Sequence, residues 1–189
     1  MLRNTGRSYG TPAILLHWTI ALLFLGQIAL GFLAQAMADR PRLQFDLYQW
    51  HKSFGFLVLA LAVPRLVWSL SGTRPAPLAG VPRWQAAAAR ATHLALLALT
   101  VAVPLAGWAI ASTSPLRIPS FAFDLVLVPD LPLSRSDAME AFWSRAHALL
   151  AYGAGLLALA HAGAALHHHF RRRDATLLRM LGKTRPPSS

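Results

Sequence analysis

One apolar stretch, residues 145–169, most constrains what this chain can fold into. It is long enough to form a helix through the hydrocarbon core of a membrane, and it contains His147 and His161, which lie 14 residues apart. At about 100° per residue this interval returns to nearly the same helix face, and at about 1.5 Å per residue it covers about 21 Å. One helix therefore presents two imidazoles to the same interior at different depths, which suits two stacked metal centres.

Three further apolar runs accompany this stretch. Hydrophobic residues make up 55% of the 189 residues and charged residues only 13%, which is not the composition of an ordinary soluble domain. The sequence predicts an all-α fold, an integral membrane four-helix bundle that forms one domain over residues 1–189. The expected transmembrane helices cover about residues 13–36, 53–70, 91–111 and 145–168, and a tail follows over 170–189.

Basic residues are distributed unequally between the two sides of these helices. Twelve Lys and Arg residues and a single acid, Asp174, fall on the side of the termini, whereas six basic and six acidic residues fall on the other side. The positive-inside rule therefore predicts a multi-pass protein with both termini in the cytoplasm. Because the basic residues flank apolar runs, they indicate orientation in a lipid bilayer and no nucleic-acid partner.

Histidines in the first two expected helices match the depths of the two in the fourth. His17 lies near the cytoplasmic surface, as His161 does, and His51 lies near the opposite surface, as His147 does. Neutral imidazole is a common axial ligand of haem iron, and two imidazoles leave no open coordination position. We therefore predict two haems inside the bundle. Single intramembrane histidines also hydrogen-bond across helices, but that interpretation does not explain two pairs matched in depth.

Cysteine is absent from the chain. Thiolate metal sites, iron–sulfur clusters and covalent haem attachment through thioether bonds are therefore excluded. Any haem has to be held non-covalently.

Several other residues are candidates for contacts with these haems. Arg65 lies 14 residues after His51, so it should share the face of His51 at the depth of the inner haem, where a propionate would balance its charge; the alternative is a side chain that snorkels to the surface. His93 and His168 are candidates for the vicinity of the inner haem or a quinone, and His93 is also an alternative iron ligand. Candidates for the edge or propionates of the outer haem are Trp50, Lys52, Trp143 and Arg145, although the tryptophans equally suit interfacial anchors.

The longest expected loop, residues 112–144, contains an apolar piece between two prolines. This piece, Phe121–Val128, is too short to cross a membrane. We expect it to form a partly buried cap on one membrane face.

The ordered set of motifs resembles the bacterial cytochrome b561 family, which are four-helix dihaem cytochromes of the inner membrane. The motifs are Leu16-His17-Trp18, Val63-Pro64-Arg65-Leu66, Thr92-His93-Leu94, Pro104-Leu105-Ala106-Gly107, Trp143-Ser144-Arg145-Ala146-His147 and Leu159-Ala160-His161-Ala162-Gly163. The resemblance covers nearly the whole chain. It implies an inner-membrane location and ligation of two haems b at the four paired histidines.

The resemblance and the histidine pairs favour a dihaem b-type cytochrome that carries electrons across the inner membrane, to or from ubiquinone. The family includes superoxide oxidases, so a superoxide:ubiquinone oxidoreductase is an alternative, although outer loops of zero net charge do not favour an anionic substrate. A further alternative is a cytochrome b subunit that serves a periplasmic redox partner. An alternative from a different class of protein is a haem-free transporter, in which the histidines would line a proton path.

The topology leads to a direct prediction. A tag placed after Ser189 should be labelled by a membrane-impermeant reagent only after the inner membrane is opened, because the basic tail is cytoplasmic. A tag inserted after Asp39 is the matched control and should be labelled from the outside. Labelling of the Ser189 tag in intact spheroplasts would overturn the orientation.

Overall fold

The computed structural model describes the whole chain except residues 1–2, 7, 73–74, 77–79 and 184–189. Arg7, Arg74, Arg185 and Ser189, which enter the charge and topology arguments, lie outside the described residues. The predicted helical bundle is confirmed. Four long helices dominate the fold: α1 (Thr11–Ala36), α2 (Pro41–Ser71), α3 (Arg83–Thr113) and α4 (Asp137–His167).

Three of these helices begin earlier than the apolar runs indicate. α2 begins at Pro41 and not near residue 53, α3 at Arg83 and not near 91, and α4 at Asp137 and not near 145. The added turns carry charged residues, which a helix accepts once it has left the hydrocarbon. Hydropathy therefore marks the boundary of the lipid and not the end of the helix. The loop expected over residues 37–50 is only a short turn between α1 and α2.

Local sequence signals mark the true helix starts. Proline occupies the first turn of both α1 and α2, where its missing N–H costs no hydrogen bond. Ser136 caps α4, because its side chain accepts a hydrogen bond from the backbone N–H of Met139. Pro64 lies within α2 and Pro104 within α3, and neither ends its helix.

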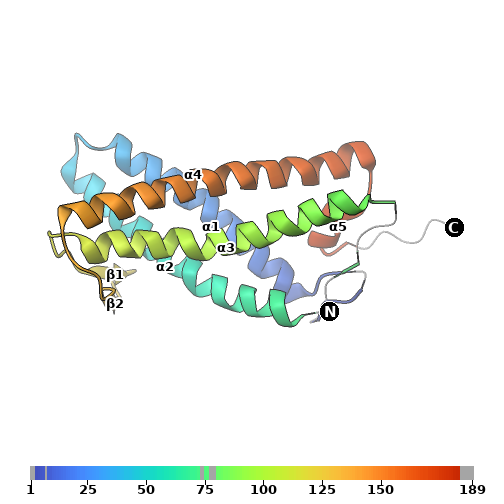
Figure 1. Cartoon of the computed structure of the whole chain (residues 1–189), viewed down its shortest axis with the longest axis horizontal. Coiled ribbons are helices and arrows are strands. Elements are labelled where there is room, and N and C mark those ends of the chain that lie inside the picture. The colour runs from blue at the N-terminus through green and yellow to red at the C-terminus, as the bar shows by residue number, and fades with distance from the viewer. Residues whose placement is uncertain (1–2, 7, 73–74, 77–79, 184–189) are drawn as a thin grey trace.

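The four helices run along one long axis, and consecutive helices pack against each other (Figure 1). All four are long and apolar enough to cross a membrane. α1 begins and α4 ends at one end of the bundle, which we call the tail end. The opposite end, where α1 leads into α2 and α3 leads into α4, carries a small hairpin, and we call it the hairpin end.

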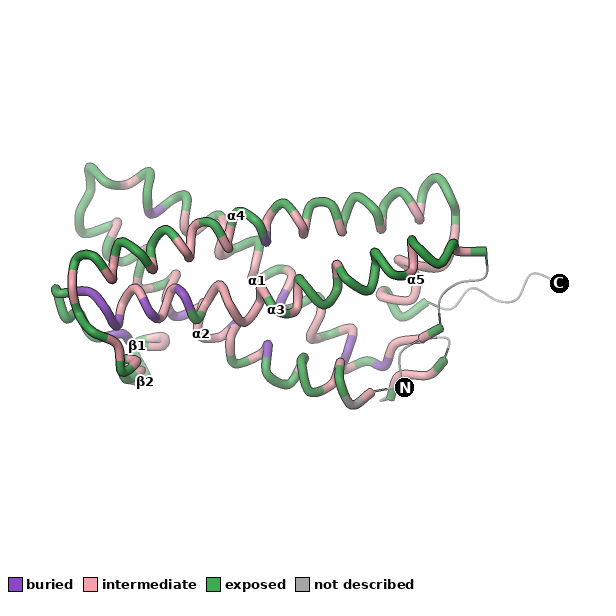
Figure 2. The backbone as a smooth tube through the Cα atoms, in the orientation of Figure 1, coloured by how far each residue is buried: buried purple, intermediate pink, exposed green. Residues whose placement is uncertain are grey.

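The bundle buries small side chains and exposes large apolar ones, which is the reverse of the usual pattern in a soluble protein. The buried apolar residues are mostly alanines, including Ala34, Ala62 and Ala106. Large leucines such as Leu149 and Leu156 point outward, and α4 is exposed along much of its length (Figure 2). Small residues let helices approach closely, while large apolar side chains meet lipid tails, so this is the pattern of a membrane-embedded bundle.

The apolar segment expected to form a cap is an antiparallel hairpin of β1 (Ser120–Ala122) and β2 (Val126–Val128). Ser53 of α2 ties it to the bundle: its hydroxyl donates to the carbonyl of Phe121 and accepts from the N–H of Phe123. Ser120 is buried, whereas most of the apolar side chains of the hairpin are exposed.

Beyond α4, the chain folds back onto the tail end of α1. The π-helical segment η1 (His168–Arg172) continues α4, and a left-handed residue, Arg173, turns the chain into α5 (Thr176–Met180). Trp18 of α1 donates its indole N–H to the carbonyl of Met180 at 2.8 Å. The segment expected as a plain tail from residue 170 therefore contains two short helical pieces, η1 and α5, joined by a turn at residues 173–175.

Candidate functional site

Two histidine pairs define the candidate site. His17 lies six residues after the start of α1, and His161 lies six residues before the end of α4. Because α1 starts and α4 ends at the same end of the bundle, the two residues come to one depth. Their ring centres lie 6.2 Å apart, with the ring planes at 77°. We call these residues the tail-end pair.

The second pair lies near the hairpin end. His51 lies ten residues after the start of α2, and His147 lies ten residues after the start of α4. Both helices start at the hairpin end, so the depths again match. The ring centres lie 6.1 Å apart, with the ring planes at 79°. We call these residues the hairpin-end pair.

The spacing within both pairs fits one metal ion between two imidazoles. Two metal–nitrogen bonds of about 2 Å each place the two ring centres about 6 Å apart. Two imidazoles are too few ligands for a bare metal ion, but they satisfy a haem iron, to which the macrocycle supplies four nitrogens. Across the described residues, no group of three or more His, Asp or Glu side chains is placed to hold a metal ion. The donor set therefore fits haem.

Glycines make room for the hairpin-end pair. A Cβ atom on Gly107 of α3 would lie 3.2 Å from Cε1 of His147 and 3.3 Å from its Nδ1. A Cβ atom on Gly31 of α1 would lie 3.5 Å from Cε1 of His51. Each imidazole thus lies against backbone where the neighbouring helix has no side chain.

Hydrogen bonds orient the same pair. Nδ1 of His147 donates to the carbonyl of Val103 at 3.0 Å, which leaves the other ring nitrogen with its lone pair free for a metal. Gln27 donates its amide N–H to the backbone carbonyl of His51 at 2.8 Å. Nδ1 of His51 is buried and has no hydrogen-bond partner among the described residues.

The tail-end pair has a cation beside it. Arg65 donates one N–H to the carbonyl of Ala13 at 2.8 Å, and its second terminal nitrogen lies 3.3 Å from Nδ1 of His17. The spacing from His51 predicts this placement of Arg65 at the depth of the inner histidines. His93 of α3 joins the same group, since its ring centre lies 5.1 Å from that of His161.

The remaining candidates lie at different places. Trp50 stacks on Phe54 at the hairpin end, 5.8 Å between ring centres, and is half exposed. Lys52 is half-buried on α2, and Arg145 is exposed on α4. The indole nitrogen of Trp143 is buried and has no hydrogen-bond partner in the described part of the chain. Among the described residues, none of these four side chains makes a hydrogen bond, ion pair or ring contact with the histidine pairs.

His168 lies in the turn between α4 and α5. Its Nδ1 lies 2.5 Å from a carboxylate oxygen of Asp174. Burial raises the pKa of Asp174, but hydrogen bonds from His168 and Thr176 outweigh it, so the pKa of this carboxyl lies below its usual value. This contact stabilises the turn that returns the chain to α1.

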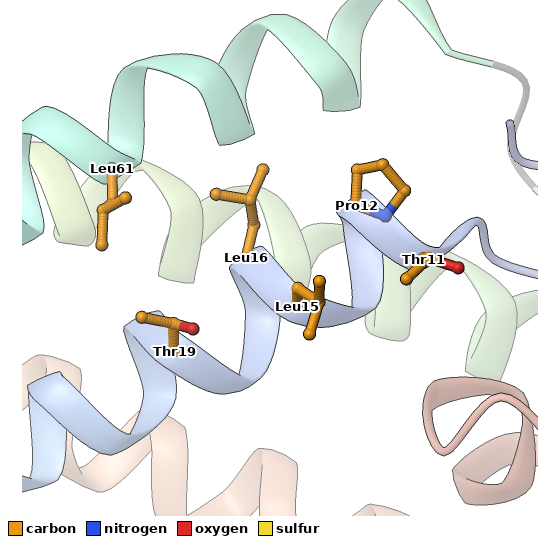
Figure 3. A pocket seen from close by; sticks show the side chains of 6 residues that line it. All are labelled: Thr11, Pro12, Leu15, Leu16, Thr19 and Leu61. Carbon is orange, nitrogen blue, oxygen red and sulfur yellow. The ribbon is translucent and has the colours of Figure 1, made fainter. Parts of the chain in front are cut away.

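Two apolar grooves open on the outside of the bundle near the tail-end pair. One, of about 470 Å³, runs along the first turns of α1, where Leu16 and Thr19 flank His17, and Leu61 of α2 forms its far wall (Figure 3). The other, of about 410 Å³, lies between α2 and α3 and includes Leu66 and Leu94, the neighbours of Arg65 and His93.

Sequence reasoning missed three residues that contact the hairpin-end pair: Gly31, Val103 and the amide of Gln27. A polar Gln27 inside an apolar run is a detectable signal, since polar side chains in membrane helices usually bond to another helix. The contacts of Gly31 and Val103 depend on how neighbouring helices rotate against each other, which the sequence of one helix does not specify.

Four apolar helices and two half-buried imidazole pairs at different depths define a multi-pass membrane protein of the electron-transfer class. A family model described as prokaryotic cytochrome b561 matches residues 8–183. The chain is 32% identical over 183 residues to cytochrome b561 homolog 2 of Escherichia coli K12, a match that covers 96% of this chain and 95% of the relative. It is 29% identical to cytochrome b561 homolog 1 of the same organism, over 92% of this chain and 96% of the relative. The chain belongs to the prokaryotic cytochrome b561 family, and membership implies a haem b protein.

The glycine contact with His147 can be tested. Gly107→Val should displace the imidazole, because added methyl groups in a packed interior cost about 1–3 kcal/mol and force neighbours to move. We expect bound haem b per chain to fall, measured by pyridine haemochrome assay on purified protein. Gly153→Val is the matched control on α4, since a Cβ atom at Gly153 meets nothing within 4 Å. Equal haem content in the two variants would contradict the packing role of Gly107.

Proposed function

We propose that this protein is a dihaem b cytochrome that carries electrons across the bacterial inner membrane, with ubiquinone as its lipid-soluble partner. The observation that carries the proposal is the two histidine pairs, which share α4 and lie about 21 Å apart along it by helix rise. His17 and His161 would hold one haem b, and His51 and His147 the other. Haem b supplies one-electron redox chemistry when it is bound.

The chain's own groups favour electron transfer over oxygen chemistry. Two imidazoles per site leave the iron no open position for oxygen. The apolar helices exclude water from the interior, which limits the reorganisation that accompanies a change of charge. The hydrogen bond from His147 to Val103 holds that imidazole in the tautomer that a metal needs.

Arg65 has a specific role in this proposal. A guanidinium only donates hydrogen bonds, so Nδ1 of His17 accepts from Arg65 and the proton of this imidazole lies on Nε2. Ligation through Nε2 requires that proton to move to Nδ1, and Arg65 must then turn to another acceptor. A haem propionate is an acceptor of the right charge.

The apolar grooves support the choice of a lipid-soluble partner at the tail end. They lie on the outside of helices that are long and apolar enough to span a membrane, and each borders a residue next to the tail-end group of histidines. A quinone dissolved in the bilayer can reach such a groove sideways. His93 lies beside His161 near this end, with 5.1 Å between the ring centres, so a quinone in this region would meet its imidazole.

The charge distribution supports the orientation in this proposal. The tail end carries the basic segment that follows α4, and the hairpin end carries as many acids as basic residues. The tail end would therefore face the cytoplasm and the hairpin end the periplasm. Arg135, one of the few cations at the hairpin end, is paired with Asp130. Because Asp130 neutralises this cation, Arg135 attracts an anion such as superoxide only weakly. The pairing therefore favours a general electron carrier over a superoxide-oxidising enzyme.

Replacement of single histidines tests the pairing. His17→Ala or His161→Ala should remove one haem and spare the other, so that haem content falls to about half, because a haem with one axial imidazole is bound weakly. His51→Ala or His147→Ala should remove the other haem. Haem content per chain and reduced-minus-oxidised spectra measure this. His93→Ala is the control and should keep both haems; loss of both haems from every folded ligand variant would break the pairing.

A second prediction concerns Arg65. Arg65→Leu should lower the midpoint potential of the tail-end haem by about 60 mV, a tenfold change in a one-electron equilibrium, because a cation that favours the reduced form is lost. A spectroscopic redox titration in nanodiscs measures it. Arg172→Leu is the matched control: its side chain is exposed at the same end and bonded to Gln85. An unchanged midpoint potential in Arg65→Leu would contradict this role and indicate that Arg65 only snorkels to the membrane surface.

The donor is distinguished in the same preparation. Superoxide should reduce the purified protein, and ubiquinone should then oxidise it, only if the protein is a superoxide:ubiquinone oxidoreductase. A carrier that serves a periplasmic protein would be oxidised by ubiquinone but would not be reduced by superoxide. Folded protein that binds no haem when haem is supplied would refute both and support the proton path.

A further inference from the structure

The hairpin at the end of α3 carries an unusual number of exposed apolar side chains. Leu125 at its tip is 85% exposed, and Phe121 and Leu127, which pair across the two strands, share a face that points away from the buried Ser120. We call the set the hairpin patch; it consists of Leu116, Ile118, Phe121, Leu125, Val126 and Leu127. A surface of this kind needs an apolar environment.

Hydrogen bonds fix the depth of the hairpin along the bundle. Ser53, which bonds to Phe121 and Phe123, lies twelve residues inside α2, or about 18 Å from its start. Trp108, which donates its indole N–H to the carbonyl of Pro129 at 3.0 Å, lies five residues before the end of α3. Both anchors belong to apolar segments long enough to span lipid. The hairpin therefore lies alongside the turns of α2 and α3 at the hairpin end of the bundle, and not beyond the ends of these helices (Figure 1).

The backbone of the hairpin limits how deep it can go. A two-stranded hairpin has two open edges, and their N–H and C=O groups would have no partners in hydrocarbon, so it does not lie in the membrane core. Its apolar patch is equally unsuited to water. Arg117 and Asp124, which are exposed beside the patch, balance each other in charge and can meet lipid headgroups.

We propose that the hairpin patch inserts into the boundary between headgroups and acyl chains of the leaflet at the hairpin end. The occupant of this surface is the bilayer in which the protein is embedded, and the patch continues the lipid-facing surface of α2 and α3. Interfacial elements of this kind enter about 5–10 Å into the boundary region.

This position has a consequence for the hairpin-end pair. Phe123, at the turn of the hairpin, packs on Phe54 with ring centres 5.2 Å apart and on Trp50 at 6.2 Å. Trp50 and Phe54 flank His51 in α2. Lipid that holds the hairpin in place therefore also holds Phe123 against the two aromatic side chains that neighbour His51 in sequence.

The absence of cysteine makes the test direct. Leu125→Cys, labelled with an environment-sensitive fluorophore, is placed in nanodiscs of zwitterionic lipid that carry a spin-label quencher either near the headgroup or at the end of the acyl chain. We expect strong quenching by the shallow quencher, little by the deep one, and a blue-shifted emission that disappears in water-exposed controls.

Asp39→Cys is the matched control, because Asp39 is exposed in the turn between α1 and α2 at the same end. Its label should be quenched by aqueous iodide and not by either lipid quencher. Iodide quenching of Leu125→Cys equal to that of Asp39→Cys would overturn the proposal and leave the patch as a surface for a protein partner. Stronger quenching by the deep than by the shallow label would overturn it too, since the hairpin would then lie in the hydrocarbon. The outcome does not depend on haem content or on the electron partner.

Discussion

The bilayer interior offers no water, so every polar group that lies within it must be satisfied by the protein or by what the protein binds. The two imidazole pairs follow from this constraint. α4 carries one member of each pair on a single face, and α1 and α2 supply the others from the matching depths. Nδ1 of His147 bonds to Val103, and Nδ1 of His17 faces Arg65.

Small residues make this arrangement possible. Alanines fill the contacts between helices, and Gly31 and Gly107 leave room for the imidazoles of the hairpin-end pair. The large leucines are directed outward, where lipid tails replace the apolar core of a soluble protein. The bundle thus reserves its interior for a prosthetic group, and residues that would fill a soluble core lie at its surface.

The two ends of the bundle differ in a way that suits vectorial electron transfer. At the tail end, Arg65 and His93 gather around the histidine pair, and apolar grooves lie on the outside of the bundle next to residues of this group. At the hairpin end, Trp50 and Phe54, the α2 neighbours of His51 in sequence, pack with each other and with Phe123 of the hairpin turn.

The sequence by itself determined the four membrane helices, the depth of each histidine and therefore the two pairs, because hydropathy and helix rise place residues along the membrane normal. It also placed Arg65 at the depth of the inner histidines, through the 14-residue interval from His51, whereas the contact of Arg65 with His17 came from the structure. Only the tertiary structure decided the return of α5 to Trp18, the contacts of Gly31 and Val103 with the imidazoles, and the hydrogen bond from Gln27 to the backbone carbonyl of His51. These depend on how neighbouring helices rotate and approach, and lateral packing of this kind leaves no periodic signal in a single chain.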